Sequence, residues 1–286
     1  MKLVLGTVQL GLEYGVSNTA GRPSLSESFD ILDEAQKLGI KELDTAQSYG
    51  ESERIIGEYL KRNPKSFEIM SKFSNVEDED YRNSIENSLN TLGLENLKGM
   101  YFHKYSDFKN LKNSSTLLKL KEEGLIENLG VSIYEQSEFE DVLNSELIDI
   151  IQIPYNLLDC SVEKERLALA AKDKNKRIYS RSAFLQGLFF LPEVKIKKDF
   201  EELYESVMEI KKIAKIYNVT LEELALGFCL QEDFLDHILV GVNSKKELSK
   251  NILSSQVKLP SQCIQEIKKI SVSNPKLLNP VHWKAI

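Results

Sequence analysis

Short apolar runs recur along the whole chain, each about four to eight residues long, which is strand length. Because they are apolar throughout, they predict strands buried on both faces, as in a parallel sheet. Their residue ranges are LVLGT (3–7), IKELDTA (40–46), FEIMSK (67–72), KGMYFH (98–103), IENLGVS (126–132), IDIIQIPY (148–155), KRIYSRS (176–182) and HILVG (237–241).

Between these runs lie stretches in which apolar residues return with a period near 3.6, which predicts amphipathic helices. The first such stretch, SESFDILDEAQKLG (26–39), has apolar residues at this period from Phe29 to Leu38. We expect Ser26 to be its N-cap and Gly39 to lie just beyond its C-terminus. Similar patterns predict helices at 51–61, 80–92, 114–123, 135–144 and 161–174.

The interval between the seventh and eighth runs holds two helical patterns, 199–217 and 220–230, where one would suffice. The second begins with Thr220 and Glu223, the spacing of a capping box. Eight β/α units are the number that closes a barrel. The prediction is therefore a single (β/α)8 TIM barrel domain over residues 1–286, of the α/β class, with an extra helix between strands seven and eight.

An open, doubly wound sheet is the alternative architecture. It would need a glycine-rich phosphate-binding turn after an early strand. The segment GTVQLGLEYG (6–15), which follows the first run, lacks the G-x-G-x-x-G spacing of that turn. The barrel is therefore preferred.

Composition narrows the class of protein. With 42% hydrophobic and 28% charged residues, the 286-residue chain has the make-up of an ordinary globular protein. A net charge of −7 argues against nucleic-acid and anionic-membrane partners. The three cysteines are scattered, which favours a reducing cytoplasm over a disulfide framework or metal site. No run is long enough to cross a bilayer. We expect a cytoplasmic protein, monomeric rather than oligomeric, that acts on a small molecule.

Four chemically active side chains fall at the ends of three successive predicted strands. Asp44 and Tyr49 lie in LDTAQSYGESE, Lys72 ends IMSK, and His103 ends MYFH. Strand ends of a β/α barrel share one rim, where catalytic groups gather. An acid, a phenol, an amine and an imidazole at that rim predict a proton-donating site.

The phenol is the expected proton donor in the reduction of a carbonyl by hydride, a case of general acid catalysis. A tyrosine with a pKa of about 10 donates poorly, but the ammonium of Lys72 would lower the pKa of Tyr49. Asp44 would hold Lys72 charged, and His103 would orient the carbonyl oxygen. Taken singly, each residue has an ordinary explanation, such as an Asx turn for Asp44. Their combination is the specific signal.

These residues resemble the aldo-keto reductase family, whose pattern is D-T-A-x-x-Y-G followed by a strand-ending Lys and a strand-ending His. Later family landmarks follow in order at GVS (130–132), IQIPYN (151–156) and GVNSKKELSKN (241–251). The resemblance implies a carbonyl reductase with NADPH as cofactor, NADH being possible, and no metal. The implied cofactor contacts are Gly6, Thr7, Asp44, Ser132, Gln152, Tyr179, Arg181, Ser182, Gln186, Gly187, Gly241, Asn243, Ser244, Lys245, Glu247 and Asn251.

Three positions depart from the family pattern. Ile133 stands where the family usually has Asn. Arg181 stands where an aromatic ring normally stacks on the nicotinamide, and Tyr179 shares its face of the strand. Either could cover the ring, and Arg181 could instead bind an anionic substrate group or form a salt bridge at the rim. Glu247 would repel the 2′-phosphate of NADPH, although Lys245 and its neighbour Lys246 could compensate.

The substrate is less defined by the sequence. The tail NPVHWKAI (279–286) is short, with Trp283 expected at the barrel bottom or on the rim, so the pocket should be open. Together with Arg181, this suggests a keto-sugar or a nucleotide-linked sugar. Two other functions stay open: a regulatory or partner-binding subunit of the same fold, and an aldolase or lyase in which Lys72 forms a Schiff base. The last requires a neutral amine, which Asp44 opposes.

Overall fold

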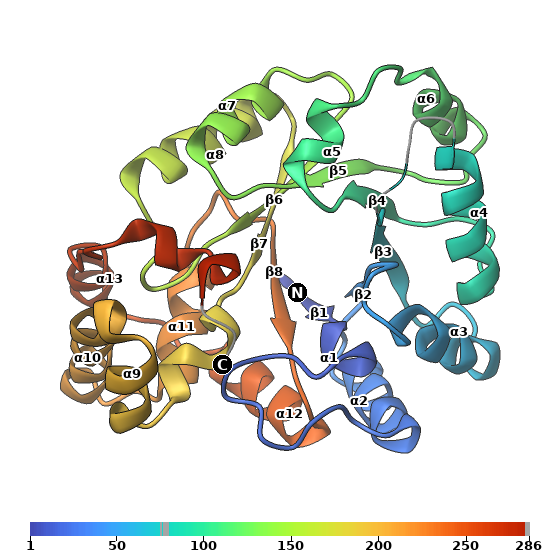
Figure 1. Cartoon of the computed structure of the whole chain (residues 1–286). Helices are drawn as coiled ribbons and strands as arrows, with labels where there is room; N and C mark the ends of the chain where they lie inside the picture. The colour runs from blue at the N-terminus through green and yellow to red at the C-terminus, as the bar shows by residue number, and fades with distance from the viewer. Residues whose placement is uncertain (75, 77–79, 284–286) are drawn as a thin grey trace.

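The computed structural model describes residues 1–74, 76 and 80–283. Eight parallel strands pair in sequence order, and β1 pairs with β8, so the sheet closes into a barrel (Figure 1). The predicted (β/α)8 barrel is therefore confirmed. The strands are β1 (Leu3–Gly6), β2 (Glu42–Asp44), β3 (Glu68–Lys72), β4 (Gly99–Phe102), β5 (Leu129–Ser132), β6 (Ile150–Pro154), β7 (Arg177–Arg181) and β8 (His237–Gly241).

The helices surround the strands as an outer layer (Figure 1). The longer ones are α2 (Leu25–Lys37), α3 (Ser52–Arg62), α4 (Tyr81–Leu92), α6 (Ser115–Glu122), α7 (Gln136–Leu143), α8 (Val162–Asp173), α10 (Glu201–Ile216), α11 (Leu221–Leu230), α12 (Lys245–Ser254), α9 (Glu193–Asp199) and α13 (Ser261–Ile267). Short segments are α1 (Val8–Gly11), α5 (Tyr105–Lys109) and the 3₁₀ turns η2 (Leu185–Phe190), η3 (Pro275–Leu278) and η4 (Pro280–His282).

Large and small side chains alternate inside the barrel. Met70, Tyr101 and Tyr179 are buried there together. Gly130 leaves room for the ring of Tyr101, because a Cβ at position 130 would lie 2.2 Å from that ring. Gly99 does the same for Met70, whose Cε would lie 2.7 Å from a Cβ at position 99. The interior is thus a packed core, as is usual for this barrel.

Helix α2 begins two residues earlier than the sequence predicted. Its N-cap is Ser24, not Ser26, because Ser24 has a glutamate three residues later. The Ser24 hydroxyl accepts from the amide of Glu27, and the Glu27 carboxylate accepts from the amide of Ser24, which completes a capping box. Gly39 follows the helix with φ +81°, as expected for a residue just beyond the C-terminus.

The connection between β7 and β8 carries the predicted insertion. Helix α11 begins at the expected capping box of Thr220 and Glu223. The pattern predicted over 199–217 forms α10, with α9 ending at Asp199 and a break at Phe200, where φ is −137°. Segment η2 and helix α9 are additional to the prediction.

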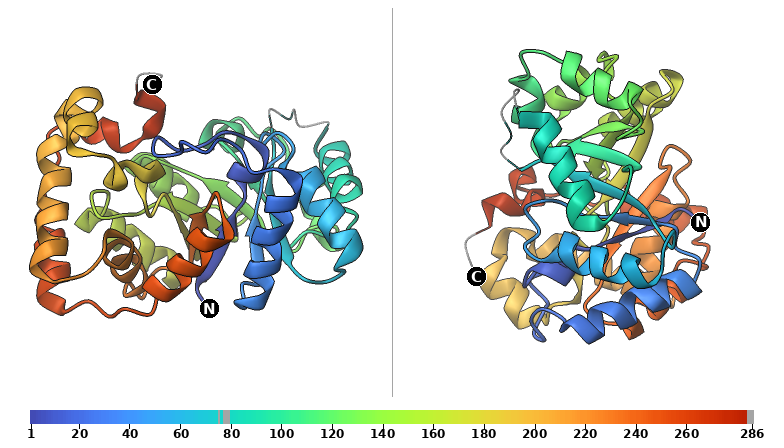
Figure 2. Two further views of the ribbon diagram at one scale, coloured as in Figure 1. Left: turned by 90° about the horizontal axis from the view of Figure 1, so that it is seen from below. Right: turned by 90° about the vertical axis from the view of Figure 1, so that its right-hand side faces the viewer.

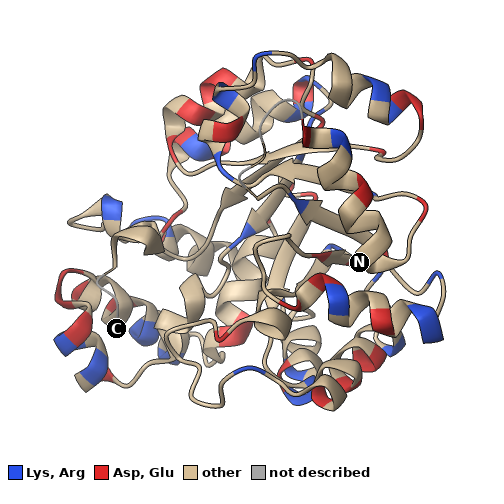
Figure 3. Ribbon diagram, turned by 45° about the vertical axis from the view of Figure 1, so that its right-hand side comes forward, with Lys and Arg blue, Asp and Glu red and all other residues tan. Residues whose placement is uncertain are grey.

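The side views show the N-terminus at one end of the barrel and the C-terminal turns at the other (Figure 2). Acidic and basic residues are interspersed over the outer helices (Figure 3). Within the described part of the chain, no helix is long and apolar enough to cross a membrane. Trp283 packs on Phe200, with ring centroids 4.8 Å apart.

Candidate active site

A cavity of about 870 Å³ opens at the ends of the strands, within the range typical of small-molecule sites. Strand-end residues line it from β1 to β8, and the C-terminal turns contribute Asn279 and Val281. The rim predicted to carry the chemistry is therefore a concave site.

The cavity contains the four residues Asp44, Tyr49, Lys72 and His103, here called the strand-end cluster. Asp44 and Lys72 are the last residues of β2 and β3, and their side chains form a buried ion pair. Lys72 Nζ also donates to the carbonyl of Thr45 at 2.9 Å. From across the barrel, Gln152 Nε2 donates to Asp44 Oδ2 at 2.9 Å. The lysine is held in one position by these bonds.

The other two members face this pair from neighbouring loops. Lys72 Nζ lies 4.9 Å from the centroid of the Tyr49 ring. The ring of His103 meets that of Tyr49 edge-on at 5.7 Å. The loop carrying Tyr49 packs against α1 so closely that a Cβ on Gly11 would lie 1.6 Å from the Tyr49 carbonyl oxygen. The structure thus brings together all four residues that the sequence singled out.

Burial changes the acidities within the strand-end cluster. Burial raises the pKa of Tyr49, and the charge of Lys72, the largest opposing effect, only partly offsets this rise. Lys72 thus lowers the pKa of Tyr49 in the sense that the sequence predicted, but burial, which the sequence did not show, outweighs it and raises the net pKa. Burial lowers the pKa of Lys72, but Asp44 and Tyr49 outweigh it, so the net pKa is raised and the amine stays charged.

His103 is neutral at ordinary pH. Burial, followed by the charges of Lys72 and Arg181, lowers its pKa to about 3. Its Nδ1 lies 3.1 Å from the hydroxyl of Ser48. A neutral imidazole has one N–H, so when Nδ1 accepts from Ser48, Nε2 carries the hydrogen and can donate it to a ligand.

Most of the expected cofactor contacts line the same cavity. They come from the ends of β1, β2, β5, β6, β7 and β8 and from the segments that follow β7 and β8. These residues are Gly6, Thr7, Asp44, Ser132, Gln152, Arg181, Ser182, Gln186, Gly187, Gly241, Asn243, Glu247 and Asn251.

Three expected contacts lie elsewhere. Tyr179 is fully buried in the barrel interior, where its hydroxyl donates to Glu42 at 3.0 Å. It shares a strand face with Arg181, but two residues displace it roughly 7 Å deeper. Ser244 is the N-cap of α12. Lys245 pairs with Asp30 on the surface, 2.9 Å away.

The structure adds cavity residues that the sequence reasoning missed. Tyr14 and residues 15 and 17–20 enter from the long connection between β1 and α2, and Phe184 and Phe190 enter from the segment around η2. These two segments touch: the amide of Val16 donates to the carbonyl of Gln186 at 2.9 Å. The available signal was the length of the β1–α2 connection, since long loops in compact domains are often functional.

Comparison with known proteins agrees with this geometry. Residues 2–272 match the family model described as the Aldo/keto reductase family. The chain belongs to that family. It is therefore an oxidoreductase of the kind that acts on carbonyl compounds.

Individual relatives are distant. The chain is 24% identical to an NADH-specific methylglyoxal reductase of Escherichia coli, covering 90% of this chain and 94% of that protein. It is 24% identical to a D-threo-aldose 1-dehydrogenase of a Pseudomonas species, covering 87% and 90%. The holo form of an aldo-keto reductase from Bacillus halodurans superimposes with a TM-score of 0.75 at 21% identity, covering 96% and 93%, which shows the shared fold.

Where α11 and α12 meet the aldo/keto reductase cavity, polar residues border it, and most of them are charged. Glu222, Glu247, Lys250 and Asn251, here called the α12 region, line it. The Glu247 carboxylate accepts from the amide of Asn243 at 2.8 Å. Lys250 pairs with Glu222 at 2.6 Å. The α12 region therefore contributes two carboxylates and one ammonium to the cavity wall.

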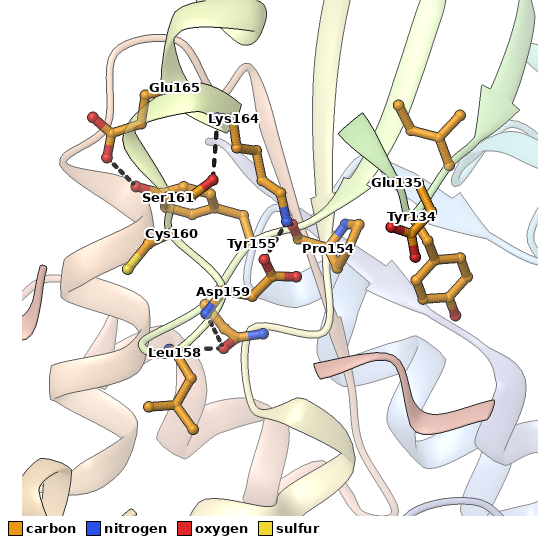
Figure 4. A network of polar contacts seen from close by, with 12 residues as sticks. Tyr134, Glu135, Pro154, Tyr155, Leu158, Asp159, Cys160, Ser161, Lys164 and Glu165 are labelled. Atoms are coloured by element: carbon orange, nitrogen blue, oxygen red, sulfur yellow. Dashed lines mark hydrogen bonds and ion pairs between the residues drawn. The ribbon is translucent and has the colours of Figure 1, made fainter. Parts of the chain in front are cut away.

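A second, smaller cavity of about 410 Å³ lies under the C-terminal segment, and Tyr134 and Asn279 line both cavities. Figure 4 shows its polar side. There Lys164 pairs with Asp159 and donates to the carbonyl of Pro154 at 3.1 Å (Figure 4). These charges stabilise the loop after β6 and are already partnered.

Proposed function

We propose that this chain reduces an aldehyde or ketone to an alcohol, using a reduced nicotinamide cofactor, with Tyr49 as the general acid. The observation that supports this most directly is the buried, charged Lys72, fixed by Asp44 and placed 4.9 Å from the Tyr49 ring inside a ligand-sized cavity. Family membership supports the reaction class.

The residues around the cavity fit a dinucleotide. Gly241 leaves room for the side chain of Gln9, since a Cβ at position 241 would lie 2.4 Å from Gln9 Nε2. Gln9 Oε1 and Asn243 Oδ1 are buried at the cavity without a hydrogen-bond partner among the described residues. Both atoms can therefore accept a hydrogen bond from a bound cofactor. Ser132 and Gln152 would hold the nicotinamide, and Asn243 and Asn251 the adenosine end. The bound cofactor would supply the hydride.

The protein's own residues would handle the proton. Tyr49 would give its hydroxyl proton to the carbonyl oxygen of the substrate. The ammonium of Lys72 would stabilise the resulting phenolate, and Asp44 would keep that ammonium in place. His103, being neutral, would donate from Nε2 to the same oxygen without competing for the proton.

The charges of the α12 region favour NADH over the NADPH that the resemblance implied. Lys245 and Lys246, the two lysines that could compensate for Glu247, are not among the described residues that line the cavity, and Lys245 pairs with Asp30. Glu247 would repel a 2′-phosphate and could accept a hydrogen bond from a free ribose hydroxyl. The names of the relatives include both cofactors: the Escherichia coli enzyme is named NADH-specific, and one from Schizosaccharomyces pombe is designated NADP(+).

A sugar-like substrate, such as a keto-sugar or a nucleotide-linked sugar, is consistent with the polar rim of the cavity. One relative is named as an aldose dehydrogenase. A regulatory subunit without turnover is the alternative, but binding alone places no demand on a buried Asp44–Lys72 pair. A Schiff-base role for Lys72 is disfavoured because its raised pKa keeps the amine protonated.

The test is oxidation of NADH and NADPH with a panel of aldehydes, ketones and keto-sugars, comparing wild type with Tyr49→Phe. We expect turnover to fall about 10²- to 10⁴-fold, with the cofactor dissociation constant, measured by fluorescence, changed only a few-fold.

The matched control is Tyr14→Phe, which removes a second phenol from the same cavity. Burial raises the pKa of Tyr14 to about 12. The Lys72 ammonium, which would stabilise a phenolate, acts on Tyr49 and not on Tyr14, so the loss of the Tyr14 hydroxyl should have a smaller effect. A large loss in Tyr14→Phe with turnover retained in Tyr49→Phe would overturn the assignment. Borohydride trapping of substrate on Lys72 would instead support the Schiff-base reaction.

A further inference from the structure

Arg181, the last residue of β7, presents a fixed guanidinium to the cavity. Its Nε donates to Ser132 Oγ at 3.1 Å, and its Nη2 donates to the carbonyl of Ile133 at 3.1 Å. The ring of Tyr134 covers one face, with its centroid 3.9 Å from the guanidinium carbon. Two hydrogen bonds and one stacked ring determine where the remaining N–H groups can point.

This cation lacks a counter-charge in the described part of the protein. No carboxylate there lies within ion-pair distance of Arg181, and Asp44 is already paired with Lys72. Both bonds that Arg181 makes are to neutral oxygens. A partly buried charge without a partner is unfavourable, so the arrangement is that of a site whose anion arrives with a ligand.

The neighbours of Arg181 in the cavity reinforce this charge. Lys104 also lines the cavity, and His103 is neutral. The carboxylates of Glu222 and Glu247 belong to the α12 region, on other elements of the rim. Arg181 and Lys104 both lower the pKa of His103, so an anion bound beside Arg181 near His103 has a second cation close to it.

We propose that Arg181 binds a carboxylate of the substrate, so that the enzyme acts on oxo acids, sugar acids included. This rests on the proposed function, because the carbonyl must lie at Tyr49 while the carboxylate lies at Arg181. Arg181 is close enough to lower the pKa values of both Tyr49 and His103. Carboxylate and reacting carbonyl thus belong to one compact molecule.

The shape of the donor favours a carboxylate. A guanidinium uses two of its five N–H groups here and keeps three. Parallel N–H donors match the two oxygens of a carboxylate in a planar, bidentate pair. The pyrophosphate of a nucleotide-linked sugar is a second possible source of negative charge, and the experiment separates the two.

The experiment measures kcat and KM for a series of oxo acids of increasing chain length, each paired with its methyl ester. For the best acid we expect kcat/KM to exceed that of its ester by about 10- to 100-fold, mainly through KM. Arg181→Gln should bring this ratio close to one. Arg181→Lys should keep part of the preference for the acid, because lysine retains the positive charge but lacks the two parallel N–H donors of a guanidinium.

Two controls accompany this series. Arg166→Gln removes an exposed arginine of α8 that pairs with Glu163, and should leave the acid-to-ester ratio as in wild type. Calorimetric binding of oxalate to the complex with oxidised cofactor gives a readout without turnover. We expect its dissociation constant to rise about 10- to 100-fold in Arg181→Gln.

Each outcome decides a different point. A wild-type acid-to-ester ratio near one would overturn the carboxylate site while leaving the reductase intact, and this result needs no variant to fold. A preference for a nucleotide-linked keto-sugar over every oxo acid, lost in Arg181→Gln, would assign the anion as phosphate and also overturn it. Full turnover of oxo acids by Tyr49→Phe would instead contradict the proposed function.

Discussion

The strand-end cluster and the α12 region lie on the same cavity but balance their charges differently. Asp44 and Lys72 are almost completely buried and neutralise each other. In the α12 region, Lys250 is 57% exposed and pairs with Glu222, while Glu247 adds a second carboxylate to the cavity wall. Buried pairs are sensitive to the loss of either partner, whereas exposed pairs are screened and weak. We therefore expect the strand-end cluster to be held rigid for the proposed reaction and the α12 region to adjust the affinity for the cofactor.

Removing one positive charge from each region should produce the largest difference between them, measured as a loss of the free energy of unfolding. Lys72→Met leaves Asp44 buried and unpaired, which should lower the free energy of unfolding by about 3–5 kcal/mol and abolish most turnover. Lys250→Met should lower it by at most about 1 kcal/mol. Urea denaturation of both variants measures the difference.

The double variant Asp44→Asn with Lys72→Met is the control for the first change. Without the orphaned carboxylate, it should be more stable than Lys72→Met alone. If Lys72→Met were no less stable than Lys250→Met, the distinction between the two regions would fail.

The same contrast explains which parts of the site the sequence could predict. Asp44, Lys72 and His103 follow apolar strands, and the closed parallel barrel places all strand ends on one rim. Recognising the alternation of strands and helices was therefore enough to predict that these three side chains lie close together. Tyr49 follows because its short loop is anchored to α1.

The α12 region depends on which face of a helix meets the cavity. Glu247, Lys250 and Asn251 are spaced as one helical face, whereas Lys245 is two residues from Glu247 and points to another side. Which side chains of α12 point to the cavity depends on where the helix begins, and the structure shows that Ser244 is its N-cap. The structure does not place Tyr179 at the cavity, for a related reason. The alternation of side chains along β7 predicts which face of the strand Tyr179 occupies, but it does not predict how deep in the barrel the side chain lies.

A second prediction concerns the pH dependence of stability. The pKa of His103, about 3 in the folded protein, lies below its ordinary value of 6.5. The unfolded chain therefore binds a proton that the folded chain does not, so stability is full above pH 6.5 and is lost as pH falls toward 3. From pH 7 to pH 5, His103 should remove about 2 kcal/mol of unfolding free energy.

The comparison variant for this effect is His103→Gln, which cannot titrate. Its unfolding free energy should fall less than that of wild type between the two pH values, by that same difference. His237 is present in both proteins, so its titration cancels. Equal pH dependence in the two proteins would mean that His103 is already solvated and not part of a desolvated cluster.

The smallest expected effect belongs to the α12 region and tests its role in cofactor choice. Glu247→Gln removes one carboxylate but keeps an acceptor for the amide of Asn243. Screened by solvent, this charge should change the dissociation constant of NADPH by about two- to five-fold, downward, with NADH nearly unaffected. Fluorescence titration of both cofactors measures it, with the exposed Glu209→Gln as control. Tighter NADPH than NADH binding by the wild type, unchanged in Glu247→Gln, would show that Glu247 does not discriminate between them.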